Sequence, residues 1–192
     1  MKPRFLILIA ALAIVFGLTA WRIANPFRQD AFTILPEQMQ PAPGFQLLDQ
    51  HNRPVQLAGY VNRYRVLLAF FDGTKGLEAD PLMVQLREYH SALKRDGVIV
   101  FGISTPMAGD LKEASAVWPF PILRDTNAGQ PDSCSSKWGC TIPGADGTTV
   151  PGIRSALFLI RQDGLVPWDG KSPRPIDQPE TAIRRILSGE LR

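Results

Sequence analysis

The sequence is poor in the residues that usually hold metal ions. Its 192 residues include two cysteines, Cys134 and Cys140, and two histidines, His51 and His90, which are widely separated from the cysteines along the chain. A structural metal site in a protein commonly needs about four such ligands close together. No phosphate-binding loop, dinucleotide fingerprint or serine-hydrolase elbow occurs either. We therefore expect neither a metal nor a cofactor.

Long runs of one charge are also absent. The 21 basic and 18 acidic residues give a formal charge of +3 and are scattered along the chain. So weak a bias does not indicate a nucleic-acid partner. Hydrophobic residues make up 45% of the chain and charged residues 20%, which is typical of a globular protein. The length favours one domain with a short extension.

One long apolar run is present, near the amino terminus. Residues 5–21 carry no charge and follow Lys2 and Arg4, a pattern typical of a transmembrane segment or a secretory signal. The charged start favours an amino terminus in the cytoplasm. We predict an uncleaved, single-pass signal anchor at 1–22, with a cleaved signal as the alternative. The globular part would then lie on the periplasmic or lumenal side of the membrane.

The rest of the chain divides into a connector and a folded domain. Residues 23–42 contain several prolines and no sustained periodicity, which predicts an extended linker. Residues 43–192 carry the apolar patterns of secondary structure and are expected to form one domain.

Apolar patterns in this domain predict an α/β order of elements. The segments 45–48 and 54–57 flank a polar turn, which is typical of a hairpin. The runs RVLLAFF at 65–71 and VIVFGIS at 98–104 predict strands buried on both faces. Between them, Asp80 followed by a proline begins a predicted helix that ends at residue 95. Further along we expect a helix at 110–117, a strand at 120–123, an irregular region at 124–152, a strand at 155–161, a tight turn, a returning strand at 165–168 and a helix at 179–187.

This order, together with several local phrases, resembles the alkyl hydroperoxide reductase/thiol-specific antioxidant family of peroxiredoxin-like redoxins. The phrases are PGFQLLD at 43–49, PVQL at 54–57, PFPILRD at 119–125 and RSALFLI at 154–160. The resemblance covers residues 41–187. It implies a thioredoxin-like mixed β-sheet flanked by helices on both faces, here preceded by an N-terminal transmembrane helix.

The resemblance also implies a peroxidatic cysteine at the start of the helix that follows the central strand. There the helix N-terminus lowers the pKa of the thiol. The matching loop at 71–80 reads FDGTKGLEAD and has no cysteine. If Thr74 matches the family's threonine, the cysteine position falls on Leu77, whereas a thioredoxin-type alignment falls on Gly76 and Ala79. We therefore expect a degenerate active site that cannot run the family's standard mechanism.

Other residues near this loop have two interpretations each. Arg154 matches an arginine with which peroxiredoxins bind the peroxide and the thiolate, but without a thiolate it suits a surface or ion-paired arginine. Thr74 and Lys75 could line an anion pocket at the helix start, although a solvated loop is the simpler interpretation. Glu78 and Asp80 are better explained by the helix dipole and by capping than by acid–base chemistry.

Cys134 and Cys140 are the only source of thiol chemistry. They lie six positions apart in CSSKWGC, a spacing that allows them to pair. We favour a structural disulfide. The alternative is a redox-active pair that exchanges with a partner thiol, in which Lys137 would lower the pKa of a neighbouring thiol.

Two functions remain open at this level. The first is a non-catalytic, membrane-anchored redoxin that binds or stabilises a membrane protein complex, using surfaces such as the proline-rich stretch at 167–179. The second is a thiol–disulfide oxidoreductase or antioxidant enzyme that uses Cys134 and Cys140. The second requires at least one accessible thiol with a low pKa.

Overall fold

The computed structural model describes residues 38–105, 115–142 and 152–191. The expected anchor at 1–22, most of the expected linker and most of the expected helix at 110–117 lie outside the described residues. Among the helices that the structure describes, none has both the length and the apolarity needed to cross a membrane.

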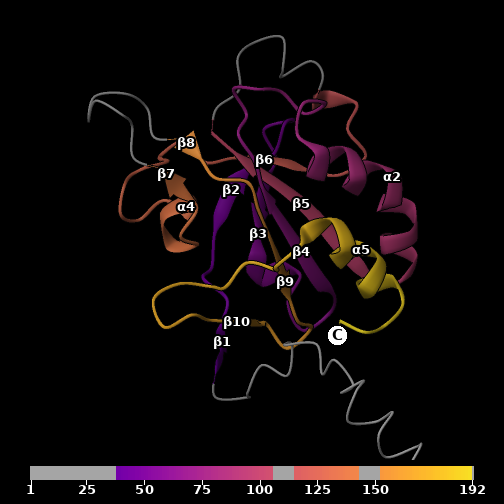
Figure 1. The fold of residues 1–192 in the computed structure, drawn as a ribbon. Coiled ribbons are helices and arrows are strands. Elements are labelled where there is room, and N and C mark those ends of the chain that lie inside the picture. Colours follow the sequence, from indigo (N-terminus) through magenta and orange to yellow (C-terminus); the bar gives the residue numbers. More distant parts are fainter. Residues whose placement is uncertain (1–37, 106–114, 143–151, 192) are drawn as a thin grey trace, which may run out of the picture. The chain divides into compact units, whose positions relative to one another are not determined.

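A six-stranded mixed sheet forms the centre of the domain, in the strand order β3-β2-β6-β5-β4-β9 (Figure 1). Strands β4, β5 and β6 are parallel, whereas β9 is antiparallel to β4 and β2 is antiparallel to both β6 and β3. The expected front hairpin and both expected central strands are thereby confirmed. The bounds are β2 Gln46–Leu48, β3 Pro54–Gln56, β4 Arg65–Phe70, β5 Val98–Ser104, β6 Ile122–Arg124 and β9 Ala156–Ile160.

Helix α2 (Pro81–Arg95) connects the two central strands as the sequence predicts. Asp80 adopts an extended backbone and caps the helix, and proline occupies its first turn. After the helix, Gly97 has a φ of 72°, a conformation that glycine adopts without the strain imposed by a Cβ. The chain then returns so that Arg65 lies opposite Val98 in the parallel pair.

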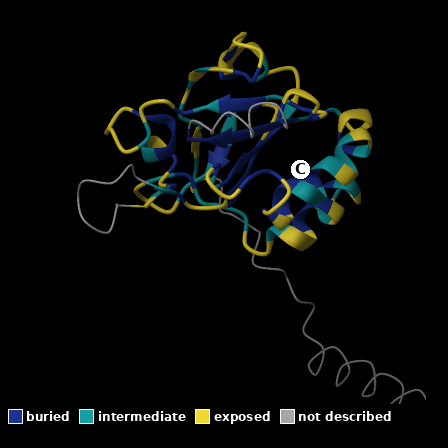
Figure 2. Cartoon of the chain, turned by 90° about the horizontal axis from the view of Figure 1, so that it is seen from above, coloured by how far each residue is buried: buried dark blue, intermediate teal, exposed yellow. Residues whose placement is uncertain are grey.

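The sheet separates two apolar cores because side chains alternate along each strand. One core lies between the sheet and the helices α2 and α5 (Pro179–Leu187). The other packs beneath the short helix α4 (Cys134–Lys137) and the 3₁₀ turn η2 (Leu57–Gly59). Figure 2 shows the central strands mostly in the dark blue of buried residues. Helices therefore cover both faces, but in the described part of the chain the second face has only short ones.

The amino-terminal boundary of the folded unit differs from the expected one. Strand β1 (Met39–Pro41) pairs with β10 (Leu165–Pro167) in a separate two-stranded sheet. Residues 39–41, which the linker at 23–42 was expected to include, are thus part of the fold. The tight turn after β9 forms, with Arg161 N donating to Leu165 O at 2.9 Å, but β10 then pairs with β1 instead of returning along β9.

The region expected to be irregular, 124–152, contains short elements. Helix α4 lies within it, and β7 (Thr141–Ile142) pairs with β8 (Gly152–Ile153). Each is two to four residues long, too short for periodicity to reveal. The strand expected at 120–123 is displaced to 122–124, where it pairs with β5.

Candidate functional site

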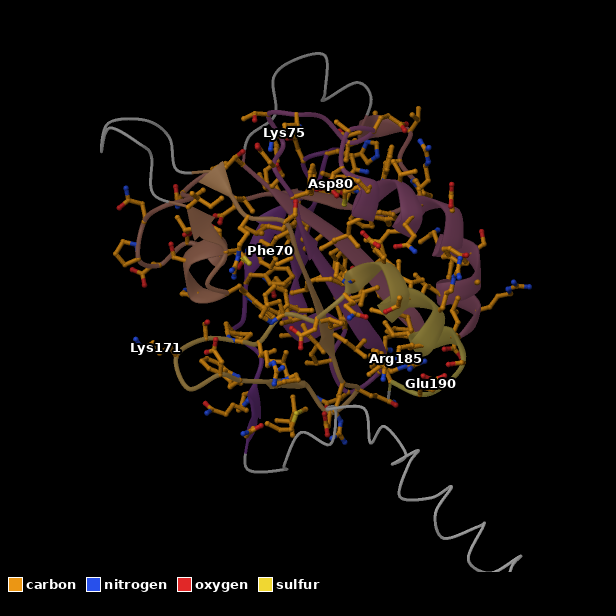
Figure 3. All side chains as sticks on the ribbon, in the orientation of Figure 1. Phe70, Lys75, Asp80, Lys171, Arg185 and Glu190 are labelled. Carbon is orange, nitrogen blue, oxygen red and sulfur yellow. The ribbon has the colours of Figure 1, made fainter. Side chains whose placement is uncertain are left out.

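The loop between β4 and α2 lies at the carboxyl end of the central strand. Figure 3 labels Phe70 at the end of β4, with Lys75 and Asp80 beyond it. In an open α/β sheet this end of the strands is where sites form. The loop is therefore the position to test for the chemistry that the sequence implies.

Asp72 accepts hydrogen bonds from within the first half of the loop. Thr74 donates to Asp72 Oδ1 through its hydroxyl at 2.6 Å and its amide at 3.0 Å. These bonds, with the hydroxyl bond the largest cause, lower the pKa of the Asp72 carboxyl from its ordinary value. Lys75 Nζ lies 3.4 Å from the other carboxylate oxygen. The charge of Lys75 is thus already met by Asp72, which does not favour an anion pocket here.

Leu77 is part of the hydrophobic core. Only 1% of its surface is exposed, and it belongs to the same cluster as Leu82, Met83 and Trp118. Gly76 before it is also buried and has a φ of 90°, which turns the chain inward at a position where a Cβ would be strained. Of the three positions that the sequence singled out, Leu77 is therefore a packing position and Gly76 a turn position, whereas Ala79 is exposed.

Asp80 occupies the N-terminus of α2. Its Oδ1 accepts from Leu82 N at 2.9 Å and from Met83 N at 3.4 Å. Its Oδ2 accepts from the hydroxyl of Ser155 at 2.7 Å. A carboxylate of the chain itself thus fills the position at which a helix N-terminus would stabilise a thiolate. Leu77 also precedes the helix, which begins at Pro81.

Arg154 connects the loop region to the cysteine segment. Its guanidinium donates to Gly139 O at 3.2 Å and its backbone amide donates to Cys140 O at 2.8 Å. Ser155, the next residue, is the one that bonds Asp80. Arg154 is exposed, and the structure records no ion pair for it among the described residues. Its observed partners are backbone carbonyls of the 139–140 turn.

Both cysteines are free, and both are buried. Cys134 is 5% exposed, in the first turn of α4, and Cys140 has no exposed surface. The expected bond between them is not formed in this structure. Cys140 Sγ instead lies 3.5 Å from Trp138 O. Trp138 packs edge-on against Phe158, with 4.9 Å between ring centroids, so its role is packing.

The surroundings of the two thiols disfavour their ionisation. Burial raises the pKa of Cys140 to about 12, with Arg154 opposing this only in part. Burial, followed by the negative charge of Asp125, raises the pKa of Cys134 well above its ordinary value, and Lys137 opposes only weakly. Asp125 is itself buried and accepts from Ser135 N at 2.7 Å. Because thiolates rather than thiols are nucleophilic, neither sulfur is poised for exchange at neutral pH.

No metal centre is found in the described part of the chain. No group of three or more histidine, cysteine, aspartate or glutamate side chains is close enough there to hold an ion. His90 packs against Phe120, with 5.6 Å between ring centroids. His51 donates its backbone amide to Asp49.

Most of the described domain matches a known protein family. The model of the AhpC/TSA family matches residues 39–168. The chain belongs to the AhpC/TSA family. This match includes the β4–α2 loop, both cysteines and Arg154, so the candidate site lies wholly inside the family domain. No curated protein matches the sequence at a significant level.

Solved peroxiredoxins share the fold of this AhpC/TSA domain. Peroxidoxin BcpB from Mycobacterium tuberculosis aligns with a TM-score of 0.57 at 18% identity, over 81% of this chain and 98% of that chain. Xanthomonas campestris peroxiredoxin Q aligns with a TM-score of 0.53 at 15% identity, over 76% and 88%. The mitochondrial 2-Cys peroxiredoxin of Plasmodium falciparum gives 0.50 at 15%, over 79% and 97%. The expected thioredoxin-like mixed sheet is confirmed.

Sequence reasoning missed two residues of this AhpC/TSA site. Ser155 ties the start of α2 to the strand beside Arg154, and Asp125 holds the first turn of α4. Asp125 is the last residue of the matched phrase PFPILRD and Ser155 lies within RSALFLI, so both were visible in the sequence. Their roles depend on contacts 75 and 10 positions away, which local patterns do not reveal.

Proposed function

We propose that this AhpC/TSA protein is a membrane-anchored redoxin without peroxidatic chemistry, and that it binds or stabilises a membrane protein complex. One observation carries the chemical part of the proposal. The residue matched to the reactive cysteine, Leu77, is a core leucine that precedes a helix already capped by Asp80.

A peroxidatic site needs three things that this arrangement does not supply. It needs a sulfur nucleophile, access for the peroxide, and positive potential to hold the thiolate. Leu77 provides no nucleophile and its burial closes the position to solvent. Asp80 places a carboxylate at the helix N-terminus, so the local charge would oppose a second anion.

The cysteines do not supply a substitute site. A relocated redox centre would need at least one accessible thiol of low pKa, whereas burial raises the pKa of both Cys134 and Cys140. The interpretation as a thiol–disulfide oxidoreductase therefore has no geometric support. What remains is a folded scaffold whose surface is free to bind.

The membrane part of the proposal rests on the sequence alone. The uncharged run at 5–21 would hold the domain at a membrane, on its periplasmic or lumenal side. The proline-rich stretch at 167–179 is less free than the sequence suggests. Arg174 N donates to Pro167 O and Ile176 N donates to Leu157 O, both at 2.7 Å, so this stretch covers the edge of β9.

The chemical claim is tested with the full chain in a mild detergent. Reduction of hydrogen peroxide and of a small disulfide substrate is measured beside a Cys134→Ser/Cys140→Ser double variant. We expect no turnover above the buffer rate in either protein. Turnover that disappears in the double variant would make the chain an enzyme and overturn the proposal.

The membrane claim is tested separately. After alkaline carbonate extraction we expect the full chain to remain with the membrane pellet, and to start at Met1 by amino-terminal sequencing. In detergent extracts of native membranes it should migrate on native gels as a species larger than the purified chain. Release by carbonate would refute the anchor, and migration at the size of the purified chain would refute the complex.

A further inference from the structure

A groove of about 420 Å³ lies beside β3, the outermost strand of the sheet. It adjoins the segment that leads into β4, whereas the candidate active-site loop follows the other end of β4. The groove is therefore separate from the AhpC/TSA site. Its lining residues are Pro54, Val55, Gln56, Gly59, Tyr60, Arg63 and Tyr64.

The polar groups of this groove favour an anion. Its lining contains one cation, Arg63, and no carboxylate. Arg63 is exposed, and neither its side chain nor the hydroxyls of Tyr60 and Tyr64 have a hydrogen-bond or ion-pair partner within the described residues. Carboxylates on adjoining segments are already paired, Asp49 with Arg53, Asp96 with Arg65 and Asp163 with Arg161. The groove thus has free donors and uncompensated positive charge.

The exposed edge of β3 adds a backbone donor. Toward β2, Leu57 N donates to Phe45 O and Asp49 N donates to Arg53 O. In an antiparallel pair, alternate residues direct their backbone groups to opposite sides, so the amide of Gln56 faces outward, on the groove side. Pro54 has no amide, which limits pairing with another strand. This edge is therefore better suited to an oxyanion than to an added β-strand.

The groove also has the form of a membrane-interface surface. Tyr64 is 41% exposed, and Tyr60 is held by edge-on packing on Phe101, with 4.9 Å between ring centroids. Tyrosine with arginine is a combination enriched where proteins meet lipid headgroups. The segment that carries Arg63 is held to the turn between β9 and β10, because Asn62 N donates to Gln162 O at 2.6 Å.

Ala42, just after β1, lies near the segment that borders this groove. Ala42 N donates to Gly164 O at 3.0 Å, and a Cβ on Gly164 would lie 3.6 Å from Val61. The chain between 22 and 37 spans at most roughly 50 Å when extended. An anchor at 5–21 would thus keep the groove close to one membrane at a high effective concentration.

We propose that this groove binds the phosphate of an anionic phospholipid in the membrane that holds the chain, with Arg63 as its charged contact. The inference rests on the proposed anchor. Tethering makes a single arginine sufficient, because the lipid surface is already within reach. The bound headgroup would fix the orientation of the domain on the membrane.

The test compares the full chain in vesicles of phosphatidylcholine with the full chain in vesicles that also contain phosphatidylglycerol. Hydrogen exchange is followed for the backbone amides of residues 59–64. We expect exchange about fivefold slower with phosphatidylglycerol, the effect of one arginine at an anionic surface. Arg63→Glu should remove this difference. Lys75→Glu, the same charge change at the other end of β4, should retain it.

The controls separate this inference from the function on which it rests. Flotation with vesicles at high salt tests the anchor, because salt screens headgroup contacts but not insertion. A chain that floats but exchanges equally in both vesicles would overturn the groove assignment and leave the anchor intact. A chain that does not float would refute the anchor and, with it, the tethered contact between the groove and the lipid. Equal protection by glycerol phosphate without vesicles would overturn the lipid as the ligand.

Discussion

Replacing Leu77 by alanine tests directly whether the matched cysteine position has become part of the core. The substitution removes roughly three carbon atoms, at about 0.8 kcal/mol each for transfer from water. A cavity adds to this, although a loop can collapse more easily than a helix or strand. Because Leu77 is 1% exposed, we expect the free energy of unfolding to fall by about 3 kcal/mol. That corresponds to a drop of roughly 6–12 °C in Tm for a domain of this size.

The assay is thermal unfolding of the full chain in a mild detergent, followed by tryptophan fluorescence. Leu48→Ala is the matched control, because it makes the same truncation at a leucine that is 44% exposed. We expect the control to lose at most about 1 kcal/mol. If Leu77→Ala lost no more than Leu48→Ala, Leu77 would not pack in the core, and the loop would be open enough to hold a ligand pocket.

Three further predictions concern the same region. Leu77→Cys restores sulfur but leaves Asp80 as the cap of α2, so we expect no peroxide turnover; activity that Leu77→Ser lacks would show that the loop still activates a thiolate. Asp80→Ala removes the cap and the partner of Ser155, and unfolding should become easier by about 1–2 kcal/mol, with Asp80→Asn retaining most stability; a loss below about 0.5 kcal/mol would contradict the capping role. Burial raises the pKa of Cys140 from 9.0 to about 12, so the folded state favours the protonated thiol. The resulting stabilisation is fully present below the unfolded pKa and is lost as the pH rises from about 9 through 12. Stability should therefore fall more steeply above pH 9 in the parent than in Cys140→Ala, and equal slopes in denaturant titrations would show that this thiol is not coupled to folding.

The central part of the fold was predictable because local signals and tertiary contacts agree there. The runs at 65–71 and 98–104 are apolar throughout and become β4 and β5, both buried on two faces. Asp80 is a favourable cap in isolation, and it caps α2 in the structure. Where propensity, patterning and packing point to the same structure, a single sequence is sufficient.

The remaining elements depend on partners that are distant in sequence. Strand β1 forms because it pairs with β10, more than 120 positions away. Its three residues include a proline and show no strand pattern of their own. Helix α4 is four residues long and is held by Ser133 and the distant Asp125. Such elements are set by tertiary contacts rather than by propensity.

The position of the candidate site and its missing cysteine were predictable from the sequence, but the packing and contacts of its residues were not. The loop sequence shows that no alignment places sulfur between 71 and 80. It does not show that Leu77 packs with the core, or that Arg154 contacts the 139–140 turn. The pairing of Cys134 with Cys140 stays a prediction from spacing, and the structure contains two free thiols instead.

This chain thus keeps the fold of the family although the reactive cysteine of the family's site is absent. The sheet, the capped helix and strand β9, which follows Arg154, keep the thioredoxin-like architecture, since these elements are stabilised by burial and hydrogen bonding. The nucleophile contributes little to that stability, and a buried leucine at its position adds apolar packing. A fold retained in this way can serve a different function, because function depends on the site and not on the architecture.

The most direct test of the central claim is the number of free thiols per chain after exposure of the native, full-length protein to hydrogen peroxide. The thiols are counted with a chromogenic thiol reagent after denaturation, and peptide mapping separates cysteine from methionine oxidation. A chain without peroxidatic or disulfide chemistry should retain both of its cysteines in the thiol form. Rapid loss of both thiols, with the gain of a Cys134–Cys140 disulfide, would contradict the account and identify the chain as a redox enzyme.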